Sequence, residues 1–388
     1  MSVDSFHTSG TSPAFARPRQ PCRIALLGFG TVGSAIAARL AGCDPVDGLE
    51  LTHILDRRAF LKRDAVAERH VLGAMPSLHR SITWTSRFDD ILATDVDIIV
   101  EAICGIEPAA EWIRAALLAG KSVVTANKQV IAHHGPALLA LAERQGRQLR
   151  FEATVGGAMP IVRAVSDGLA GDRLTRIVGV LNGTCNAVLC RMETTGCSVA
   201  DAVVDAKRRG YAEVDPSTDL DGVDARAKLA ILCALGFRLR VDPARIETRS
   251  IARLQPAELD RVRRRGGAIR QLAFAEYDRA RSALTAWVAP AVVPRSSLFG
   301  RTAGAQNAAL VTGEHAGEIG VFGAGAGGPA TAVAAISDLL TIARDRAAIV
   351  PAPVLSAPGF IIGLDRGTHI VDFMEQPARP ADPLAEAV

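Results

Sequence analysis

The sequence predicts an α/β protein in which a doubly wound parallel sheet is followed by a second, α+β domain with a mixed sheet. Two observations lead to this fold class. Over roughly the first 150 residues, short apolar runs alternate with helical patterns, which is typical of a parallel sheet with helices on both faces. The chain of 388 residues also exceeds the usual size of one hydrophobic core, so two domains are expected.

The first predicted elements form a dinucleotide-binding motif of the Rossmann type. A short apolar strand at 23–27 runs into the sequence GFGTVG, and a helical pattern follows at 35–40. Glycines at this strand-to-helix turn let the backbone approach a pyrophosphate, which then lies on the helix N-terminus. The residues expected to contact the cofactor here are Gly28, Gly30, Thr31, Val32 and Gly33.

The next strand bears on the choice of cofactor. It covers 51–55 and ends at Asp56, where this fold usually places the acid that binds the adenine ribose. Arg57 follows, and a guanidinium group suits the bidentate contact of a 2′-phosphate. Asp56 therefore favours NAD and Arg57 favours NADP, while a plain surface arginine is the alternative. The balance leans slightly towards NADP.

The following elements lead to Lys128. A strand at 95–103, a helix at 108–119 and a strand at 122–125 precede Asn127 and Lys128 at the start of another helix. Ligands of doubly wound sheets bind at the carboxyl ends of strands, so Lys128 lies on the ligand side. A lysine at a helix N-terminus opposes the helix dipole, and the chain has only five lysines, which favours a functional role.

A glycine-rich turn follows the first sheet. Residues 151–160 predict a strand that runs into this turn and then into a helix at Ile161. Small residues leave the carbonyl oxygens accessible, which suits a close substrate or a monovalent cation. A turn between domains is the other interpretation and is favoured on physical grounds alone. Beyond it we expect a strand at 176–181 and a helix with Thr184 as its N-cap.

The segment from Gly210 to Lys228 places several acidic residues ahead of a single lysine. Its five acids are Glu213, Asp215, Asp219, Asp221 and Asp224. Asp224 and Lys228 are four residues apart on a predicted helix, so the carboxylate can hold the amine in place. The alternative is a solvated acidic loop with a surface ion pair that contributes little stability. The spacing alone leaves both interpretations open.

The second domain is predicted to have its own sheet. Strand patterns cover 282–293, 308–312 and 318–322, and the last two form a hairpin. An open sheet of this kind often pairs across a two-fold axis. A glycine-rich loop at 323–328 then leads into a helix at 331–343.

Composition excludes several classes of protein. The net charge of +3 with few aromatic residues argues against a nucleic-acid surface, and no apolar run approaches the roughly 20 residues that span a membrane. The N-terminal residues 1–20 lack an apolar segment, so a disordered tail is expected rather than a secretory signal. Seven scattered cysteines without a Cys-x-x-Cys pair indicate a reduced cytoplasmic compartment, with most of them buried.

Taken together, these motifs resemble those of homoserine dehydrogenases over about residues 23–338. The shared motifs are GFGTVG, TANK, EATVGGAMP, LNGTCN, GYAEVDP with DGVDARAK, and GAGAGGPATA. The resemblance implies reversible oxidation of L-homoserine to L-aspartate 4-semialdehyde by NAD(P), in the biosynthesis of threonine, methionine and isoleucine. It also implies a homodimer.

The resemblance assigns roles to individual residues. The catalytic pair is Lys228 and Lys128, and Lys128 also lies near the nicotinamide. The substrate ligands are Glu213, Asp219 and Asp224. The positions whose backbone carbonyls hold a sodium ion are Glu152, Val155, Gly157 and Met159. Two further cofactor contacts are Gly210 and Gly325.

The chemistry of lysine fits such a reaction. Hydride transfer to an aldehyde builds negative charge on oxygen, and a nearby ammonium group stabilises the alkoxide and supplies a proton. In the opposite direction the amine must be neutral, so alcohol oxidation is expected to accelerate as the pH rises. A dehydrogenase of another small hydroxy or oxo amino acid is one alternative, and a non-catalytic dinucleotide-binding regulator is another. The presence of both lysines and all the pocket acids counts against the regulator.

The expected domains follow from the same resemblance. Residues 21–155, completed by 323–345, form the dinucleotide-binding domain, and 156–322 form the substrate-binding and dimerisation domain. Residues 346–388 are expected to be a tail that is too short for a regulatory ACT domain. One departure from the family is Cys104, which follows the fourth strand where relatives often have a glycine-rich turn, and which is expected to alter the nicotinamide contact or make the site thiol-sensitive.

Overall fold

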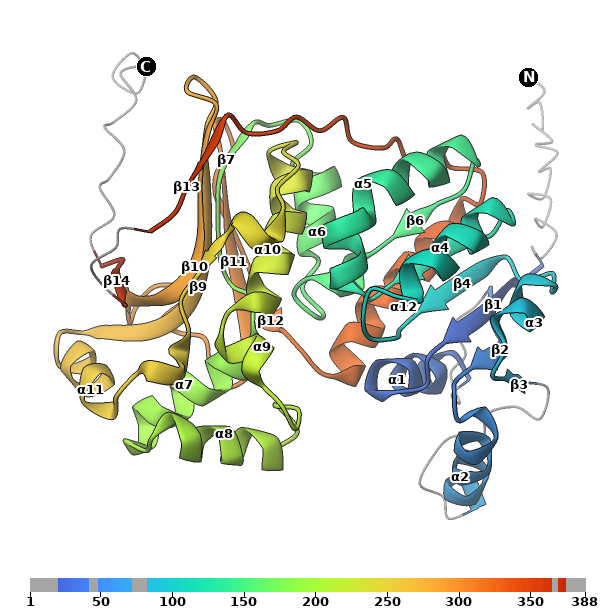
Figure 1. Cartoon of the computed structure of the whole chain (residues 1–388), viewed down its shortest axis with the longest axis horizontal. Coiled ribbons are helices and arrows are strands. Elements are labelled where there is room, and N and C mark those ends of the chain that lie inside the picture. Colours follow the sequence, from blue (N-terminus) through green and yellow to red (C-terminus); the bar gives the residue numbers. More distant parts are fainter. Residues whose placement is uncertain (1–19, 42–47, 72–81, 365–368, 375–388) are drawn as a thin grey trace, which may run out of the picture.

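The computed structural model describes residues 20–41, 48–71, 82–364 and 369–374. The predicted N-terminal tail lies outside these ranges, apart from Gln20. Figure 1 shows two sheets at opposite ends of the molecule with helices packed between them. Among the described helices, none is long and apolar enough to cross a membrane.

The first sheet is parallel and has six strands in the order β3-β2-β1-β4-β5-β6. Its strands are β1 (Cys22–Leu27), β2 (Leu49–Leu55), β3 (Thr83–Thr85), β4 (Ile98–Glu101), β5 (Ser122–Thr125) and β6 (Leu149–Arg150). Its helices are α1 (Thr31–Leu40), α2 (Ala59–Val71), α3 (Phe88–Leu92), α4 (Ala109–Leu118) and α5 (Lys128–Arg144). The strand order reverses between β1 and β4, as in doubly wound dinucleotide-binding domains, which confirms the predicted fold class.

The connection to the second sheet differs from the prediction. The strand expected to run from Phe151 into the glycine turn is wrong, because β6 ends at Arg150 and a 3₁₀ turn (Glu152–Thr154) follows. The Thr154 backbone N–H and hydroxyl both donate to the Phe151 carbonyl, at 3.0 and 2.6 Å, and these bonds close a turn where an extended chain was expected. The predicted helix at Ile161 is present as α6 (Ile161–Arg163), which continues as one π-helical turn (Ala164–Gly168).

The second sheet is mixed, as predicted, and its main strands run in the order β12-β11-β7-β9-β10-β13. Its strands are β7 (Leu174–Val180), β8 (Glu247–Thr248), β9 (Gly267–Asp278), β10 (Ala283–Pro294), β11 (Gln306–Gly313), β12 (Gly317–Ala324), β13 (Phe360–Ile362) and β14 (Val371–Asp372). The predicted β11–β12 hairpin is present. The expected C-terminal tail contributes β13 and β14, which both pair in parallel with β10.

Several helices cover the second sheet. They are α7 (Gly183–Thr195), α8 (Val199–Arg208), α9 (Ser217–Leu220), α10 (Val223–Gly236) and α11 (Pro256–Arg264), with 3₁₀ turns at Pro243–Arg245 and Ile251–Arg253. The prediction that Thr184 caps α7 is wrong. Asn182 is the N-cap and accepts a 2.8 Å hydrogen bond from the Cys185 N–H, whereas the Thr184 hydroxyl lies inside the helix and donates to the Tyr211 carbonyl.

The last long helix, α12 (Gly328–Arg344), returns to the first sheet and packs against α1. Buried residues of α12, such as Leu339, share one core with Leu26 of β1 and Ile36 of α1. The approach is close: a Cβ at Gly328 would lie 2.6 Å from the Thr31 carbonyl oxygen. The parallel sheet is therefore covered by a helix that comes from the far end of the chain.

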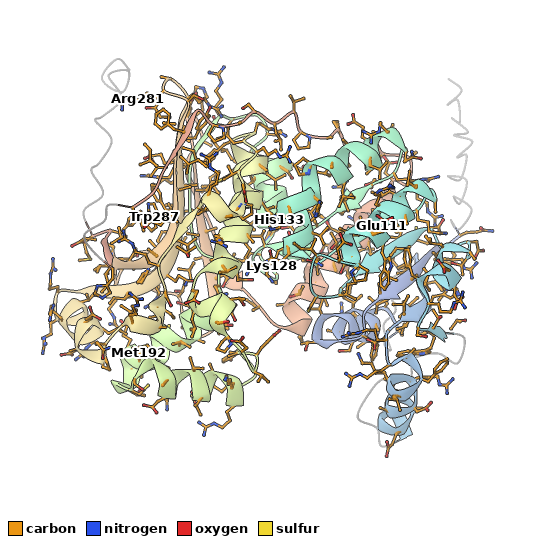
Figure 2. All side chains as sticks on the ribbon, in the orientation of Figure 1. Glu111, Lys128, His133, Met192, Arg281 and Trp287 are labelled. Carbon is orange, nitrogen blue, oxygen red and sulfur yellow. The ribbon has the colours of Figure 1, made fainter. Side chains whose placement is uncertain are left out.

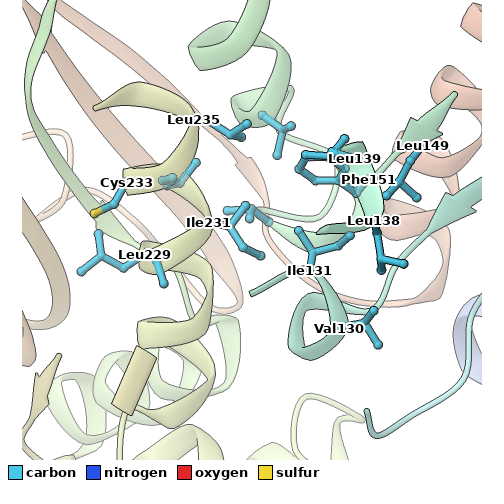
Figure 3. Packing of buried hydrophobic residues seen from close by; sticks show 14 of the residues in the cluster. Val130, Ile131, Leu138, Leu139, Leu149, Phe151, Leu229, Ile231, Cys233 and Leu235 are labelled. Atoms are coloured by element: carbon cyan, nitrogen blue, oxygen red, sulfur yellow. The ribbon is translucent and has the colours of Figure 1, made fainter. Parts of the chain in front are cut away.

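Helices α5 and α10 lie side by side between the two sheets. Figure 3 shows Ile131 and Leu139 of α5 facing Ile231 and Leu235 of α10. These residues belong to a core that continues into both halves of the molecule. The two helices consequently hold their first residues, which include the predicted catalytic groups, at one common end.

Candidate active site

Asp224 lies between the two predicted lysines. Its Oδ2 is 2.8 Å from the Nζ of Lys228 on the same helix, and its Oδ1 is 3.0 Å from the Nζ of Lys128 at the start of α5. Lys228 also donates a 2.7 Å hydrogen bond to the Leu181 carbonyl. Asp224 and Lys228 are only 6% and 9% exposed, so the alternative of a solvated surface pair is wrong. Figure 2 shows Lys128 at the junction of the two halves.

Asn182 connects the acids of this site. Its side-chain amide donates to Asp219 Oδ1 at 2.7 Å and to Asp224 Oδ2 at 2.9 Å, while its oxygen caps α7. The amide of Gln271 on β9 donates to the Asp219 carbonyl at 3.3 Å. The position of both carboxylates is therefore fixed by the turn after β7 and by the sheet beneath it.

Burial and neighbouring charges within the site shift three pKa values. Burial opposes the charged form of Asp224, but the ammonium groups of Lys228 and Lys128 outweigh it and hold the pKa of Asp224 well below its usual range. Asp224 in turn raises the pKa of Lys128. Burial, reinforced by Asp224, raises the pKa of Asp219. A cation bound beside Asp219 would stabilise its charged form.

A hydrogen-bonded turn joins Lys128 to the end of β4. The amide of Asn127 donates to the carbonyls of Ile103 and Gly105, at 3.3 and 2.7 Å, and its oxygen caps α5 by accepting from the Val130 N–H. Glu101, fully buried at the end of β4, accepts hydrogen bonds from the Ile103 N–H and the Thr125 hydroxyl. Burial raises the pKa of Glu101 to about 7. Its buried contacts fix the turn beside Lys128.

The exposed Cys104 lies within this turn. Three of the six cysteines in the described ranges are buried, namely Cys22, Cys185 and Cys233. Cys190 and Cys197 are half-buried, so half of the described cysteines are fully buried where most were expected to be.

The predicted dinucleotide motif has the close packing that its glycines require. Gly28 has a φ of +94°, and a Cβ there would lie 2.7 Å from the Ala102 carbonyl oxygen. A Cβ at Gly33 would overlap the Gly28 carbonyl oxygen. A Cβ at Gly30, the N-cap of α1, would have no described neighbour within 4 Å, so the helix N-terminus is open to a ligand. Thr31 and Val32 form the first turn of α1.

Asp56 is already engaged by the protein. Its carboxylate accepts hydrogen bonds from the N–H groups of Phe29 and Arg58, at 3.0 and 2.9 Å, and lies 2.5 Å from the Nζ of Lys62. Lys62 also donates to the Phe29 carbonyl at 2.8 Å. Arg57 is exposed at the same strand end. Sequence reasoning missed Lys62, since its position one turn into α2 carries no motif.

The glycine turn after β6 lies against the end of β12. Gly156 and Gly157 have φ values of +80° and +60°, and a Cβ at Gly157 would lie 2.6 Å from the Ala324 carbonyl oxygen. Gly325 follows directly, beside the Asn307 side chain. Among the four carbonyl positions predicted for a cation, Met159 accepts a 2.8 Å hydrogen bond from the Ile161 N–H, and Glu152 accepts a 3.4 Å bond from the Val155 N–H.

Two predicted residues lie apart from the lysine pair. Glu213 and Gly210 are exposed in the turn between α8 and α9, and no hydrogen bond or ion pair links the Glu213 side chain to another described residue. Gly210 has a φ of +75°, and a Cβ there would meet no atom of the described chain within 4 Å. The structure therefore brings together Lys128, Asp219, Asp224 and Lys228, but leaves Glu213 at the rim.

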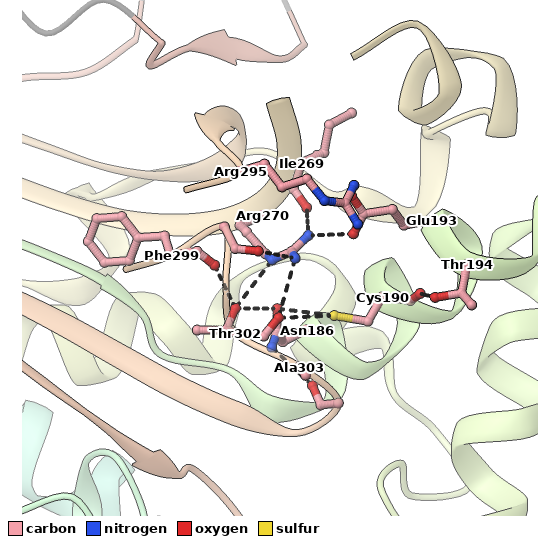
Figure 4. Close-up of polar contacts among 12 residues, drawn as sticks. Asn186, Cys190, Glu193, Thr194, Ile269, Arg270, Arg295, Phe299, Thr302 and Ala303 are labelled. Atoms are coloured by element: carbon pink, nitrogen blue, oxygen red, sulfur yellow. Dashed lines mark hydrogen bonds and ion pairs between the residues drawn. The ribbon is translucent and has the colours of Figure 1, made fainter. Parts of the chain in front are cut away.

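A buried polar network supports the floor of the second domain. Arg270 on β9 is 3% exposed and donates to Thr302 Oγ1, to three backbone carbonyls and to Glu193 (Figure 4). Asn186 of α7 donates to the carbonyls of Gly304 and Gln306. These bonds hold the loop before β11 against α7, which carries the Asn182 cap.

Comparisons with known proteins agree with this geometry. The sequence model of the family described as homoserine dehydrogenase matches residues 160–340, and that of its NAD-binding domain matches 28–152. The chain is 37% identical to the homoserine dehydrogenase of Corynebacterium glutamicum over 347 residues, covering 87% of this chain and 76% of that protein. It is 33% identical to the Bacillus subtilis enzyme, covering 83% and 73% respectively.

Solved structures give the same result. A homoserine dehydrogenase from Thiobacillus denitrificans is similar with a TM-score of 0.77 and 32% identity, covering 89% of this chain and 80% of that one. A hyperthermophilic archaeal homoserine dehydrogenase in complex with NADPH has a TM-score of 0.68 and 28% identity, covering 86% and 100%.

Proposed function

The chain belongs to the homoserine dehydrogenase family, and we propose that Lys228 and Lys128 act on the reacting oxygen in its active site. The enzyme is an NAD(P)-dependent oxidoreductase that interconverts L-homoserine and L-aspartate 4-semialdehyde. Support for the two roles comes from one observation: hydrogen bonds and close contacts run from the dinucleotide motif through Ala102 and Asn127 to Lys128 and Asp224. The lysine pair thus borders the cofactor motif.

Charge development explains how this arrangement favours the reaction. Hydride arrival at the aldehyde carbon leaves negative charge on its oxygen, and two ammonium groups on either side of Asp224 can stabilise it. We assign proton transfer to Lys228, which the Leu181 carbonyl and Asp224 hold in a fixed orientation. When bound, the dinucleotide supplies the hydride.

Substrate binding falls to the carboxylates. Asp219 is the proposed ligand of the substrate ammonium group, because a cation at that point would offset the unfavourable burial of its charge. Asp224 contributes indirectly by holding the lysines. Glu213 is proposed to reach the substrate when the turn that carries it moves inwards. Replacing Glu213 by Gln should therefore raise the KM for homoserine and leave kcat nearly unchanged.

NADP is the proposed preferred cofactor. Three protein donors already occupy the Asp56 carboxylate, which reduces its capacity to accept from a ribose hydroxyl. Lys62 and the exposed Arg57 add positive charge beside it, which suits a 2′-phosphate. Lys62→Ala should raise the KM for NADP at least tenfold more than the KM for NAD. Equal effects on both cofactors would contradict the preference, and Lys207→Ala on α8 serves as the matched control.

A sodium site is proposed at the carbonyls of Glu152, Val155, Gly157 and Met159. The left-handed glycines fold this segment into a tight, buried turn, which suits a small cation bound by backbone oxygens. Two of the four carbonyls already accept backbone hydrogen bonds, so cation binding would require these bonds to weaken. We expect activity to increase when NaCl is added to an assay buffer prepared without sodium. Tetramethylammonium chloride at equal ionic strength should have no effect.

The assembly and the domain roles are also proposals. We propose a homodimer in the cytoplasm, with residues 156–322 forming both the substrate pocket and the contact between subunits. On the second sheet, β12 pairs with β11 alone among the described strands and exposes Phe322, which is 67% exposed. Light scattering after size exclusion should give twice the 40.8 kDa mass of the chain.

One assay tests the catalytic assignment. NADP and NAD reduction with L-homoserine is measured at alkaline pH for the native protein, for Lys228→Ala and for the control Lys207→Ala. We expect loss of at least a thousandfold in kcat for Lys228→Ala and little change in the control. Full activity of Lys228→Ala would refute the role of the lysine, while inactivity of the native protein would lead to a panel of other hydroxy amino acids.

A further inference from the structure

A cavity lies at the opposite end of α5 and α10 from the lysines. Its volume is about 520 Å³, and its walls include Leu139 of α5, Leu235 of α10 and the segment 350–354. Leu139 and Leu235 each lie eleven residues beyond Lys128 and Asp224, roughly 16 Å along the helix axes. The cavity lining contains neither lysine nor Asp224.

The segment between α12 and β13 closes one side of this cavity. It crosses over the ends of α5 and α10 in Figure 1. The Ala352 N–H donates to Glu143 of α5 at 3.0 Å, and Ser356 exchanges backbone hydrogen bonds with Arg238 and Arg240. The cavity is thus bounded by both halves of the molecule.

Three arginines contribute to the lining. Arg163 is paired with Asp338 at 2.6 Å and lies 3.7 Å from Glu152. Arg150 bonds only to the neutral Gln148 side chain, and the Arg238 side chain has no hydrogen bond or ion pair within the described part of the chain. Among the described residues, the Arg238 side chain therefore has no carboxylate partner, and Arg150 has only an electrostatic interaction with Asp338 without a hydrogen bond.

The acids at the cavity are already engaged. Glu152 accepts from the N–H groups of Val162 and Arg163, both at 2.9 Å, and Asp338 accepts from the Glu152 N–H and from Arg163. Asp167 is exposed and accepts from the Ser166 hydroxyl. Glu152 and Asp338 are therefore occupied, and the lining groups left to recognise an anion are Arg150 and Arg238.

The backbone at Arg238 is unusual. It has a φ of +59° directly after α10, at a position where glycine is favoured. A long cationic side chain at such a position has a conformational cost, and a residue of this kind is more often retained where its side chain has a task.

The rest of the lining is apolar. Leu149, Phe151 and Val162 contribute to it, and a smaller apolar cleft of about 30 Å³ continues between α5 and α10. Leu139, Phe151, Leu235 and Pro353 line both spaces. A ligand with one anionic end and a short branched hydrocarbon body matches this combination.

We propose that this cavity binds a small carboxylate with a branched apolar body, held by Arg150 and Arg238, and that binding changes turnover at the lysine pair. The coupling rests on the proposed roles of the lysines, whereas the binding site does not. Helices α5 and α10 share one core along their length, so a wedge between their far ends shifts the relative positions of Lys128 and Asp224.

Calorimetric titration with 4-methylpentanoate tests the site. We expect saturable binding to the native protein, and at least tenfold weaker binding of the uncharged 4-methylpentanamide. Arg238→Asn, which tolerates a left-handed φ, and Arg150→Gln should each weaken binding at least tenfold. The control Arg281→Gln, on an exposed turn, should bind like the native protein.

Three results would overturn the site: no saturable binding, equal binding of the amide, or native affinity in both arginine variants. Binding is measured without cofactor or substrate, and Lys228→Ala should retain it, so the outcome is independent of the catalytic assignment. Coupling is tested by homoserine oxidation at a saturating concentration of 4-methylpentanoate. We expect at least a twofold change in kcat or KM that disappears in Arg238→Asn, and binding without such a change would overturn the coupling.

Discussion

At the scale of single residues, the decisive feature is one carboxylate shared by two lysines. Asp224 contacts both Nζ atoms, and the two lysines come from different halves of the molecule. A shared counter-ion keeps two like charges close together without requiring either to lose its proton. The position of Asp224 therefore sets the distance between the two lysines that are proposed to act on the reacting oxygen.

Asp224→Asn should lower kcat by roughly a hundredfold to a thousandfold, since both lysines lose their common partner. Because Asp224 raises the pKa of Lys128, the variant should also move the corresponding limb of the pH profile to lower pH. The measurement is kcat/KM for homoserine between pH 6 and 10. Asp221→Asn, an exposed acid in the same segment, is the control and should behave like the native enzyme.

Part of this site could be predicted from the sequence. The four-residue spacing of Asp224 and Lys228 already placed them on one helical face, and scarcity of lysine drew attention to Lys128. The link between the two lysines could not be predicted, because it depends on how α5 packs against α10. Asn182 was visible as part of LNGTCN, but its contacts with Asp219 and Asp224 arise only from the tertiary fold.

At the scale of elements, two glycines in the turn between β1 and α1 are required for different structural reasons. Gly33 has no room for a Cβ, since the Gly28 carbonyl occupies that space, whereas Gly30 faces open space at the helix N-terminus. Packing therefore constrains Gly33, and access of a ligand constrains Gly30.

Gly33→Ala should destabilise the protein by about 3 kcal/mol, because the added methyl group overlaps the backbone and the turn has to shift. Gly30→Ala should leave the thermal midpoint nearly unchanged and raise the KM for the dinucleotide. Differential scanning fluorimetry and cofactor titration separate these effects. Equal midpoints for the two variants would show that the turn adapts to both methyl groups.

A buried acid holds helix α12 in place against the turn after β6. Asp338 is 1% exposed and accepts hydrogen bonds from the Glu152 N–H and from Arg163. Asp338→Ala should lower the free energy of unfolding by about 3 to 5 kcal/mol, because it removes the nearest carboxylate from Arg163 and leaves the buried Glu152 N–H without its acceptor. Denaturant titration measures the change, with Val333→Ala, a half-exposed position on the same helix, as control. A loss below 1 kcal/mol would mean that water replaces the carboxylate.

Prediction was less successful for elements than for motifs. The strands β1, β2, β5 and β7 and the hairpin β11–β12 followed from apolar runs and turn residues. The strand expected from Phe151 does not form, since local hydrogen bonds to the Phe151 carbonyl and the bond from the Glu152 N–H to Asp338 close a turn instead. The second of these contacts joins residues 186 positions apart, and no local pattern contains it.

At the scale of the whole molecule, a buried acid at the end of β4 makes the stability of the protein depend on pH. Burial raises the pKa of Glu101 from 4.5 to about 7, so the native state binds its proton more tightly than the unfolded chain does. The contribution of this group to stability is complete below pH 4.5 and is lost as the pH rises to about 7.

Native stability, measured relative to Glu101→Gln, should therefore fall by about 3 kcal/mol between pH 4.5 and 7 and then level off. Urea unfolding of both proteins at several pH values gives the difference. Glu111→Gln, an exposed position on α4, should show no such trend. A difference that stays constant with pH would mean that the Glu101 carboxyl group keeps an ordinary pKa in the native protein.

The return of α12 to the first sheet has a consequence for protein engineering. Residues 21–155 look like a self-contained module along the chain, yet the helix that covers Leu26 and Ile36 begins only at Gly328. A gene fragment ending near 155 would yield a polypeptide with a bare apolar face and a tendency to aggregate. Exchanging cofactor specificity between relatives by recombination therefore requires two simultaneous crossovers, one in the glycine turn at 156–157 and one in the loop before Gly328.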